Sequence, residues 1–159
     1  MTASPTANIP RRLRIAELQD LNGQEIGVTD WLTISQSRID RFAECTEDSQ
    51  WIHVDAEKAK AESIFKTTIA HGFLTLSLTS FFVHRLLKIE DATMVINYGL
   101  NRVRFPSPVR VDSQLRARVA LSNCEPIKGG AHYGLSITIE VRDSQKPACV
   151  AELIFRALY

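Results

Sequence analysis

The chain has 159 residues and a formal net charge of +1, with 45% hydrophobic and 23% charged residues. This length suits one domain with a sizeable core, and the near-neutral charge argues against a general nucleic-acid binder, which normally carries a basic excess. No apolar run is long enough to span a membrane, and the N-terminus lacks the apolar core of a signal peptide, so we expect a cytoplasmic protein.

The three cysteines, Cys45, Cys124 and Cys149, are odd in number and unevenly spaced. A disulfide framework or a cysteine metal site normally shows paired cysteines at regular spacings. We therefore expect three buried thiols in a reducing compartment, and we predict no metal site.

The N-terminal part of the chain begins without hydrophobic periodicity, and we expect a loose tail over residues 1–12. Residues 13–21 fit a short helix that Gly23 ends. Residues 25–34 are rich in strand formers and predict an extended segment, with Trp31 in the core.

A helix with one buried face is predicted to follow. Ser35 or Ser37 is a candidate N-cap, and Ile39 and Phe42 fall on one stripe of the helix. We expect this helix to end near Thr46, in the polar stretch that follows.

Asp48 and His53 lie five residues apart in that polar stretch. On a continuous helix this offset would place them about 140° apart around the axis, so a shared water requires a break between them. Asp48 is a potential general base, and His53 can donate or accept a proton near neutral pH. An exposed helix over residues 54–63 is predicted next.

The strongest helix prediction covers residues 71–88, where large apolar side chains occupy nearly every side. A helix of this kind is buried all round. Gly72, just inside its start, can offer an unobstructed backbone N–H to a developing oxyanion.

After residue 92 the hydrophobic period changes from 3.6 to 2, which predicts strands. In the first of them the apolar residues change from even-numbered to odd-numbered positions shortly after Gly99, so we expect a bulge or bend there. The predicted strands cover residues 93–105, 115–121, 133–141 and 148–159. A hairpin turn is predicted at residues 125–130, between the second and third of them. Together with the early strand they predict an α+β domain in which a four-strand meander curls around one long buried helix. Its open edge favours pairing in a homodimer.

Three segments now carry a resemblance: ECTEDSQWIHVD at 44–55, TTIAHGFLTLSL at 67–78 and YGLNRVRFPSPV at 98–109. In order and spacing they resemble the MaoC-like family of hotdog-fold (R)-specific enoyl-CoA hydratases, and most closely its NodN-like branch. The resemblance implies a single hotdog fold, with residues 1–23 as a tail and short helix and 24–159 as the MaoC-like hotdog domain.

The resemblance implies reversible syn hydration of a trans-2-enoyl thioester to the (R)-3-hydroxyacyl thioester. Asp48 would activate a water held between it and His53, His53 would supply the proton to Cα, and the N–H of Gly72 would bind the thioester oxygen. No cofactor is required. The implied partners are acyl-CoA or an acyl carrier protein thioester and a second copy of the chain, in a homodimer or a dimer of dimers, without nucleic acid or membrane.

Four further residues are weaker substrate-binding candidates. Ser80 matches a hydroxyl position of some family members, His71 opens the long helix, Trp51 replaces the usual proline of the motif, and Arg104 is a candidate for the CoA phosphates. The arginines considered for this last role are Arg102, Arg104 and Arg110. Glu47 replaces the usual glycine beside Asp48, where it either raises the pKa of Asp48 or points to solvent.

Plainer readings compete with these roles. Asp48 and His53 alone would be an N-cap and a surface imidazole, His71 a packing residue, and Ser80 a hydroxyl bonded to the preceding helical turn. A thioesterase would need a carboxylate on the long helix, and residues 72–83 contain none. A hotdog that binds acyl-CoA without turnover is the third alternative, kept open by Glu47.

Overall fold

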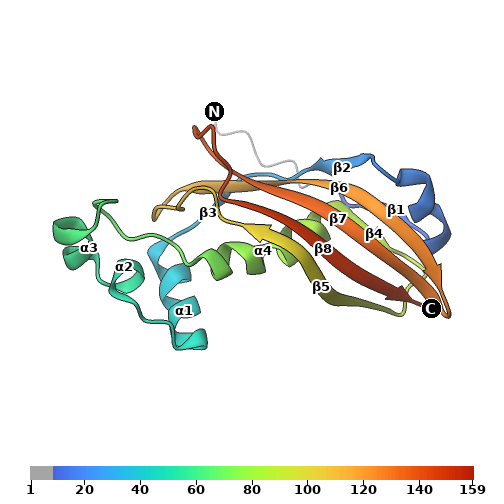
Figure 1. The fold of residues 1–159 in the computed structure, drawn as a ribbon, viewed down its shortest axis with the longest axis horizontal. Coiled ribbons are helices and arrows are strands. Elements are labelled where there is room, and N and C mark those ends of the chain that lie inside the picture. The colour runs from blue at the N-terminus through green and yellow to red at the C-terminus, as the bar shows by residue number, and fades with distance from the viewer. Residues whose placement is uncertain (1–8) are drawn as a thin grey trace.

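The computed structural model describes residues 9–159. A curved antiparallel sheet covers one long helix, α4, while three shorter helices, α1 to α3, lie together beyond one end of the sheet (Figure 1). In the described part of the chain, every helix is too short or too polar to cross a bilayer.

The helices are the 3-10 helix η1 (Ile15–Leu21) and the α-helices α1 (Gln36–Thr46), α2 (Trp51–Val54), α3 (Ala56–Glu62) and α4 (Gly72–Leu86). The strands are β1 (Arg11–Leu13), β2 (Glu25–Val28), β3 (Leu32–Thr33), β4 (Leu87–Ile89), β5 (Met94–Arg104), β6 (Gln114–Ile127), β7 (Gly130–Val141) and β8 (Cys149–Leu158).

The order of the strands in the main sheet is β2-β6-β7-β8-β5, and β3 also pairs with β6. The predicted four-strand meander is therefore wrong in one connection. β5 pairs with β8 instead of β6, so it lies at the sheet edge opposite β2. The predicted irregularity near Gly99 is confirmed, since the register with β8 shifts between Asn97 and Gly99.

The core lies between the sheet and α4. The alternation predicted for β7 and β8 is confirmed, because every second side chain of each strand is buried: Tyr133, Leu135, Ile137, Ile139, Cys149, Ala151, Leu153 and Phe155. Helix α4 buries Leu78 and Phe82 against them. Burying these side chains is the main stabilisation of the domain, about 1.5–3 kcal/mol for each large one.

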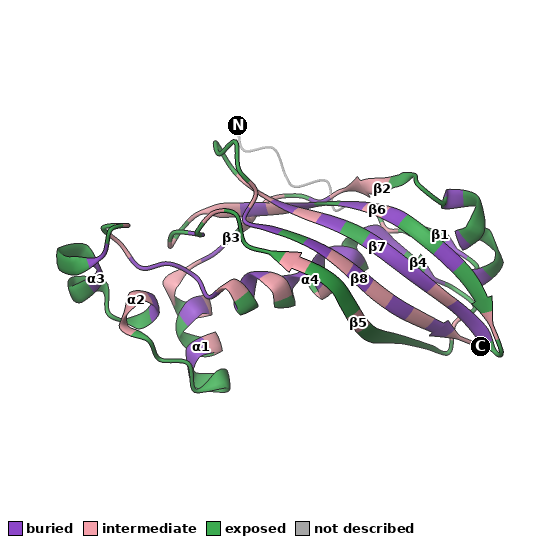
Figure 2. Ribbon diagram, in the orientation of Figure 1, coloured by how far each residue is buried: buried purple, intermediate pink, exposed green. Residues whose placement is uncertain are grey.

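Helix α4 is not buried all round, contrary to the expectation from its apolar sequence. Thr75 and Thr79 are buried, while Phe73 is 69% exposed and Phe81 37% exposed. Exposed Phe73 and Ser77 of α4 line one cavity with Asn97 and Leu100 of β5. Figure 2 shows that β5 is itself exposed along most of its length. One side of the helix is thus left uncovered by residues 9–159.

The N-terminal segment is more ordered than predicted. Residues 11–12, assigned to the loose tail, belong to β1, which pairs in parallel with β4. Residues 9–10 have no regular secondary structure, and residues 1–8 of the predicted tail lie outside the described residues. Leu18 of η1 is fully buried in the core. Local periodicity did not reveal β1 because the strand is formed by pairing with a distant segment. Arg11 lies opposite Leu87, which is 76 residues away in sequence.

Helix α1 ends at Thr46, as predicted, and the break before His53 is confirmed because α2 starts only at Trp51. Glu47 ends α1 in the left-handed conformation, with φ 58° and ψ 18°. This is the backbone region that glycine adopts at no steric cost. Asp55 caps the start of α3, since its Oδ1 accepts the N–H of Lys58 at 2.9 Å.

The expectation of three buried thiols holds for Cys124 and Cys149, whereas Cys45 is exposed on α1. Burial raises the pKa of Cys149 to about 11, so this thiol stays neutral near pH 7.

Candidate active site

His53 is held by the short helix α2 and is 7% exposed. Its Nδ1 lies 2.6 Å from the backbone oxygen of Ile69. A carbonyl oxygen only accepts, so Nδ1 carries the hydrogen, and in the neutral ring Nε2 is left with a free lone pair.

The environment of His53 lowers its pKa below the ordinary value of 6.5. Burial is the largest cause, because it disfavours the charged ring, and the neighbouring His71 adds to it, while the hydrogen bond to Ile69 and the carboxylate of Asp48 oppose it. At neutral pH the ring is therefore a proton acceptor at Nε2.

Asp48 lies in the turn between α1 and α2 and is exposed. A carboxylate oxygen of Asp48 and a ring nitrogen of His53 are within 4.8 Å of each other. Two hydrogen bonds through one water span up to about 5 Å, so the two groups are spaced to share a water. The break between α1 and α2 is what brings them together.

His71 lies directly behind these two residues and is 2% exposed. Its Nε2 donates to the backbone oxygen of Asp48 at 2.9 Å, and its ring stacks on His53 with centroids 3.7 Å apart. Phe42 of α1 packs against the ring from another side. His71 therefore holds both members of the pair, one by a hydrogen bond and the other by stacking.

The possible ligand atoms of Asp48, His53 and His71 all lie within 4.8 Å of one another, so these residues are candidate metal ligands. The two imidazole planes are only 27° from parallel and are stacked face to face. A metal ion bound by a histidine nitrogen lies near the plane of that ring, and stacked rings do not direct their lone pairs to one point. The stacking therefore does not suit a metal centre.

Gly72 is the first residue of α4, and its N–H has no acceptor among the described residues. A Cβ at this position would lie 3.2 Å from the ring of Phe105, so glycine allows this close approach. His53 and Gly72 line one cavity of about 390 Å³ together with Thr75, Phe105 and Val109. Proton acceptor and helix N-terminus thus face the same space.

The structure does not bring the other predicted site residues to this cavity. Ser80 lies two turns further along α4, facing Asn97 of β5, and its hydroxyl makes no bond to the preceding turn. The ring of Trp51 packs under the ammonium of Lys58. Arg104 is exposed, and its guanidinium donates to the backbone of Val103.

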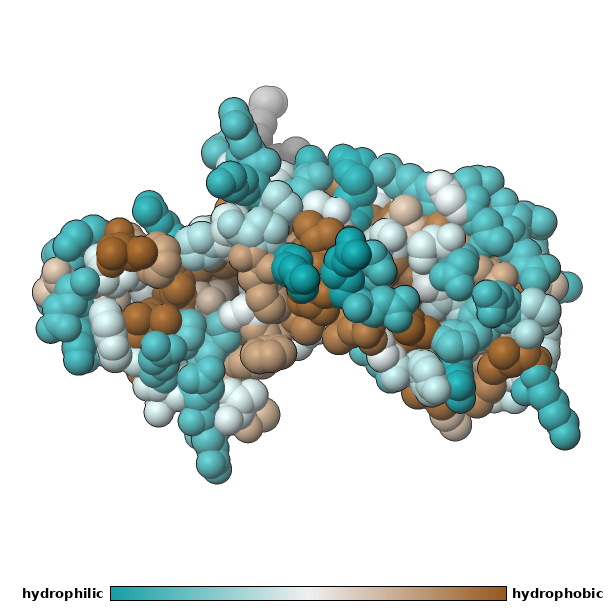
Figure 3. Space-filling view, viewed as in Figure 1, coloured by the Kyte–Doolittle hydropathy of each residue, from teal (hydrophilic) through white to brown (hydrophobic). Residues whose placement is uncertain are grey.

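Two residues that line the cavity, Thr75 and Phe105, were missed from the sequence. Thr75 is one turn after Gly72, so helical spacing alone places it on the same side of α4. Phe105 reaches the site only because the end of β5 lies beside the start of α4. On the face shown in Figure 3, apolar surface lies between the α1–α3 region and the sheet.

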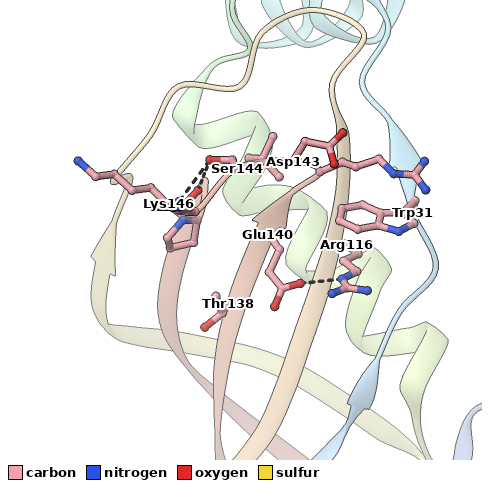
Figure 4. A pocket seen from close by; sticks show the side chains of 11 residues that line it. Trp31, Arg116, Thr138, Glu140, Asp143, Ser144 and Lys146 are labelled. Carbon is pink, nitrogen blue, oxygen red and sulfur yellow. Dashed lines mark hydrogen bonds and ion pairs between the residues drawn. The ribbon is translucent and has the colours of Figure 1, made fainter.

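A second cavity of about 430 Å³ lies on the outer face of the sheet and is lined by Trp31, Arg116 and Glu140 (Figure 4). Trp31 is half-buried there, not in the core as predicted, with the guanidinium groups of Arg116 and Arg142 at 4.6 and 5.3 Å from its ring. Arg116 forms an ion pair with Glu140 at 2.6 Å. Glu140 is thus paired with Arg116, while the guanidinium of Arg142 donates to the side chain of Gln114.

Comparison with protein families matches residues 17–140 to the MaoC-like domain. This chain belongs to the MaoC-like family. Among its relatives, 3-hydroxyacyl-thioester dehydratase Z of Mycobacterium tuberculosis is 47% identical over 143 residues, which span 89% of this chain and 94% of that protein. Nodulation protein N of Rhizobium leguminosarum is 44% identical and spans 89% of each chain.

The unliganded R-hydratase PhaJ1 from Pseudomonas aeruginosa has a similar structure, with a TM-score of 0.75 and 25% identity over 92% of this chain and 86% of that one. The expected hotdog fold is confirmed by this neighbour and by an R-hydratase from A. caviae. The relatives also establish the class: this MaoC-like protein is an enzyme of the hydratase or dehydratase type.

Proposed function

We propose that this MaoC-like enzyme hydrates trans-2-enoyl thioesters to (R)-3-hydroxyacyl thioesters and catalyses the reverse dehydration. The observation that carries the proposal is the pairing of Asp48 and His53, within 4.8 Å, beside a cavity that Gly72 also lines. The substrate is an acyl-CoA or an acyl carrier protein thioester.

Water bridges the carboxylate of Asp48 and Nε2 of His53. As the water oxygen bonds to Cβ, the Cα–Cβ π electrons move toward the thioester and the water proton passes to neutral His53. The imidazolium then returns that proton to Cα, which completes addition of one water to one face of the alkene. Asp48 orients the water and stabilises the imidazolium.

This division of roles differs from the one implied by the resemblance, in which Asp48 takes the water proton. The hydrogen bond from Nδ1 to Ile69 and the lowered pKa of His53 favour the histidine as the proton acceptor. Proton transfer by such a group contributes roughly 10²–10⁴ in rate.

The thioester oxygen gains negative charge as Cβ is attacked, and we place it on the N–H of Gly72. That group is at the positive end of α4. One such donor contributes about 10²–10³ in rate. His71 serves in this proposal as a positioning residue, since it is buried behind the pair and does not line the cavity.

The test is the loss of enoyl-thioester absorbance with crotonyl-CoA, with the product coupled to an (R)-specific dehydrogenase. We expect turnover by the unmodified enzyme and losses of at least about 10²-fold in the folded variants Asp48→Asn and His53→Ala. Full activity in both variants would overturn the assignment of the pair. Hydrolysis to free thiol would favour a thioesterase, although α4 carries no carboxylate.

We further propose that two copies associate through β5. This edge strand is exposed along most of its length and carries apolar side chains that include Met94, Ile96 and Tyr98. Unpaired backbone groups on an apolar edge favour pairing with another strand. We also propose a cytoplasmic location, because all three cysteines are free.

A further inference from the structure

An additional cavity of about 330 Å³ lies at the far end of α4, away from the catalytic pair. Its walls include Val83 of α4, Leu87 of β4, Val95 of β5 and Phe155 of β8. These side chains are apolar, but Tyr133 of β7 is also part of the wall.

Tyr133 is 2% exposed, and its ring stacks on Phe155 with centroids 5.4 Å apart. Its hydroxyl makes no hydrogen bond with any residue that the structure describes. The hydroxyl oxygen is not fully shielded from solvent, so it opens onto the cavity and can donate to a group bound there. Burial also raises the pKa of Tyr133, so the hydroxyl remains a neutral donor.

Three cavities follow one another along α4, from the cavity beside Gly72 to this one. The middle one, of about 370 Å³, lies against Phe73 and Ser80 of α4, Leu100 of β5 and Leu153 of β8. The middle and last cavities thus follow the same three elements. From Gly72 to Val83 the helix rises about 17 Å, which an extended chain of about fourteen bonds would span.

We propose that the Tyr133 cavity receives the far end of the acyl chain and that this end carries an oxygen group, a hydroxyl or a carbonyl, which hydrogen-bonds to Tyr133. This inference rests on the proposed function, because it takes the thioester to lie at Gly72. His84 and Lys88, both exposed, stand at the cavity wall and give a polar end group a polar rim. The substrate class is then a long, distally oxygenated acyl thioester.

The experiment measures binding, so that it does not depend on hydration. Calorimetry compares 14-hydroxytetradecanoyl-CoA with tetradecanoyl-CoA, two saturated thioesters that offer no alkene to react, on the unmodified enzyme and on Tyr133→Phe. In Tyr133→Phe we expect the Kd of the hydroxylated thioester, relative to the Kd of tetradecanoyl-CoA, to be about fivefold to tenfold higher than in the unmodified enzyme. Tyr159→Phe, an exposed tyrosine at the C-terminus, is the matched control and leaves the ratio unchanged.

A shorter pair, 8-hydroxyoctanoyl-CoA and octanoyl-CoA, ends before the cavity and shows the same ratio in both proteins. Without ligand, Tyr133→Phe melts at or above the temperature of the unmodified enzyme, because the lost hydroxyl has no partner. An equal ratio for the long pair in both proteins overturns this inference, as does binding of free 14-hydroxytetradecanoic acid alongside bound tetradecanoyl-CoA. Absence of crotonyl-CoA hydration overturns the proposed function instead.

Discussion

Glu47 adopts a backbone conformation that glycine occupies without strain. At φ 58° its Cβ crowds the following carbonyl, which costs about 1–2 kcal/mol for a residue other than glycine. The strain lies next to Asp48, at the point where α1 must stop so that Asp48 and His53 can face one water.

We therefore predict that Glu47→Gly raises the free energy of unfolding by about 1 kcal/mol, measured by urea denaturation. The matched control is Glu44→Gly, one turn earlier on the exposed side of α1, which lowers it by about 1 kcal/mol. The same substitution then has opposite signs at two positions of one helix end. A loss of stability in both would mean that the left-handed conformation at Glu47 carries no strain.

His53 also predicts a pH dependence. The pKa of the folded-state ring is lowered from 6.5, so between this lowered value and pH 6.5 the unfolded chain binds more protons than the native one. Stability therefore falls as pH drops below about 6.5. Because the mechanism needs neutral His53, kcat/KM is expected to be level near neutral pH and to fall tenfold per pH unit below the lowered pKa.

Substitution of His71 tests whether this residue positions Asp48 and His53. His71→Phe keeps a ring stacked on His53 but removes the donor to Asp48, and we expect kcat to fall about tenfold or more. Because His71 contributes to lowering the pKa of His53, the acid limb of kcat/KM should also move upward, toward pH 6.5. His132→Phe, on the outer side of the sheet, leaves the limb in place; a fall in kcat with no shift of the limb would reduce His71 to a packing role.

At the level of elements, the start of α4 is arranged for close approach. Phe105, at the end of β5, lies where a Cβ on Gly72 would be only 3.2 Å from its ring. The helix N-terminus, the cavity and the strand end therefore depend on one another.

Gly72→Ala is expected to lower stability by about 1 kcal/mol, through crowding of Phe105, and to lower kcat/KM about tenfold or more, because the methyl displaces the N–H from the thioester oxygen. Thermal unfolding and crotonyl-CoA kinetics measure the two effects. In the stability measurement, Gly99→Ala is the control, since nothing lies within 4 Å of the added methyl group. Recovery of activity in Gly72→Ala/Phe105→Ala would identify the crowding as the cause.

At the level of the whole molecule, the uncovered side of α4 and the exposed strand β5 lie side by side. Phe73 is 69% exposed and Tyr98 53% exposed. A monomer rarely presents so much apolar surface along an unpaired edge, and a twofold-related copy would cover it.

We predict that Ile96→Lys, near the start of β5, converts a dimer to a monomer in light scattering coupled to size-exclusion chromatography. A lysine on the edge adds a charge that strand pairing would desolvate. Ile64→Lys, an 86% exposed residue of the loop after α3, should leave the mass of a dimer unchanged. A monomeric unmodified enzyme, or a dimer that tolerates Ile96→Lys, would exclude β5 as the interface.

Most of the longer helices and strands and the candidate site residues could be predicted from the sequence alone. Local periodicity predicted α1, α4 and the last three strands, although β6 runs on to Ile127 through part of the predicted turn and α4 ends at Leu86, before β4. The spacing of Asp48 and His53 required the break that the structure contains. These features are readable because each depends on neighbours within a few residues along the chain.

The tertiary structure decided what depends on distant segments. It placed β5 beside β8, paired β1 with β4, left Phe73 exposed, and stacked His71 on His53. Strand order and side-chain exposure are properties of contacts between residues far apart in sequence, and hydrophobic periodicity carries no information about which strand lies next to which.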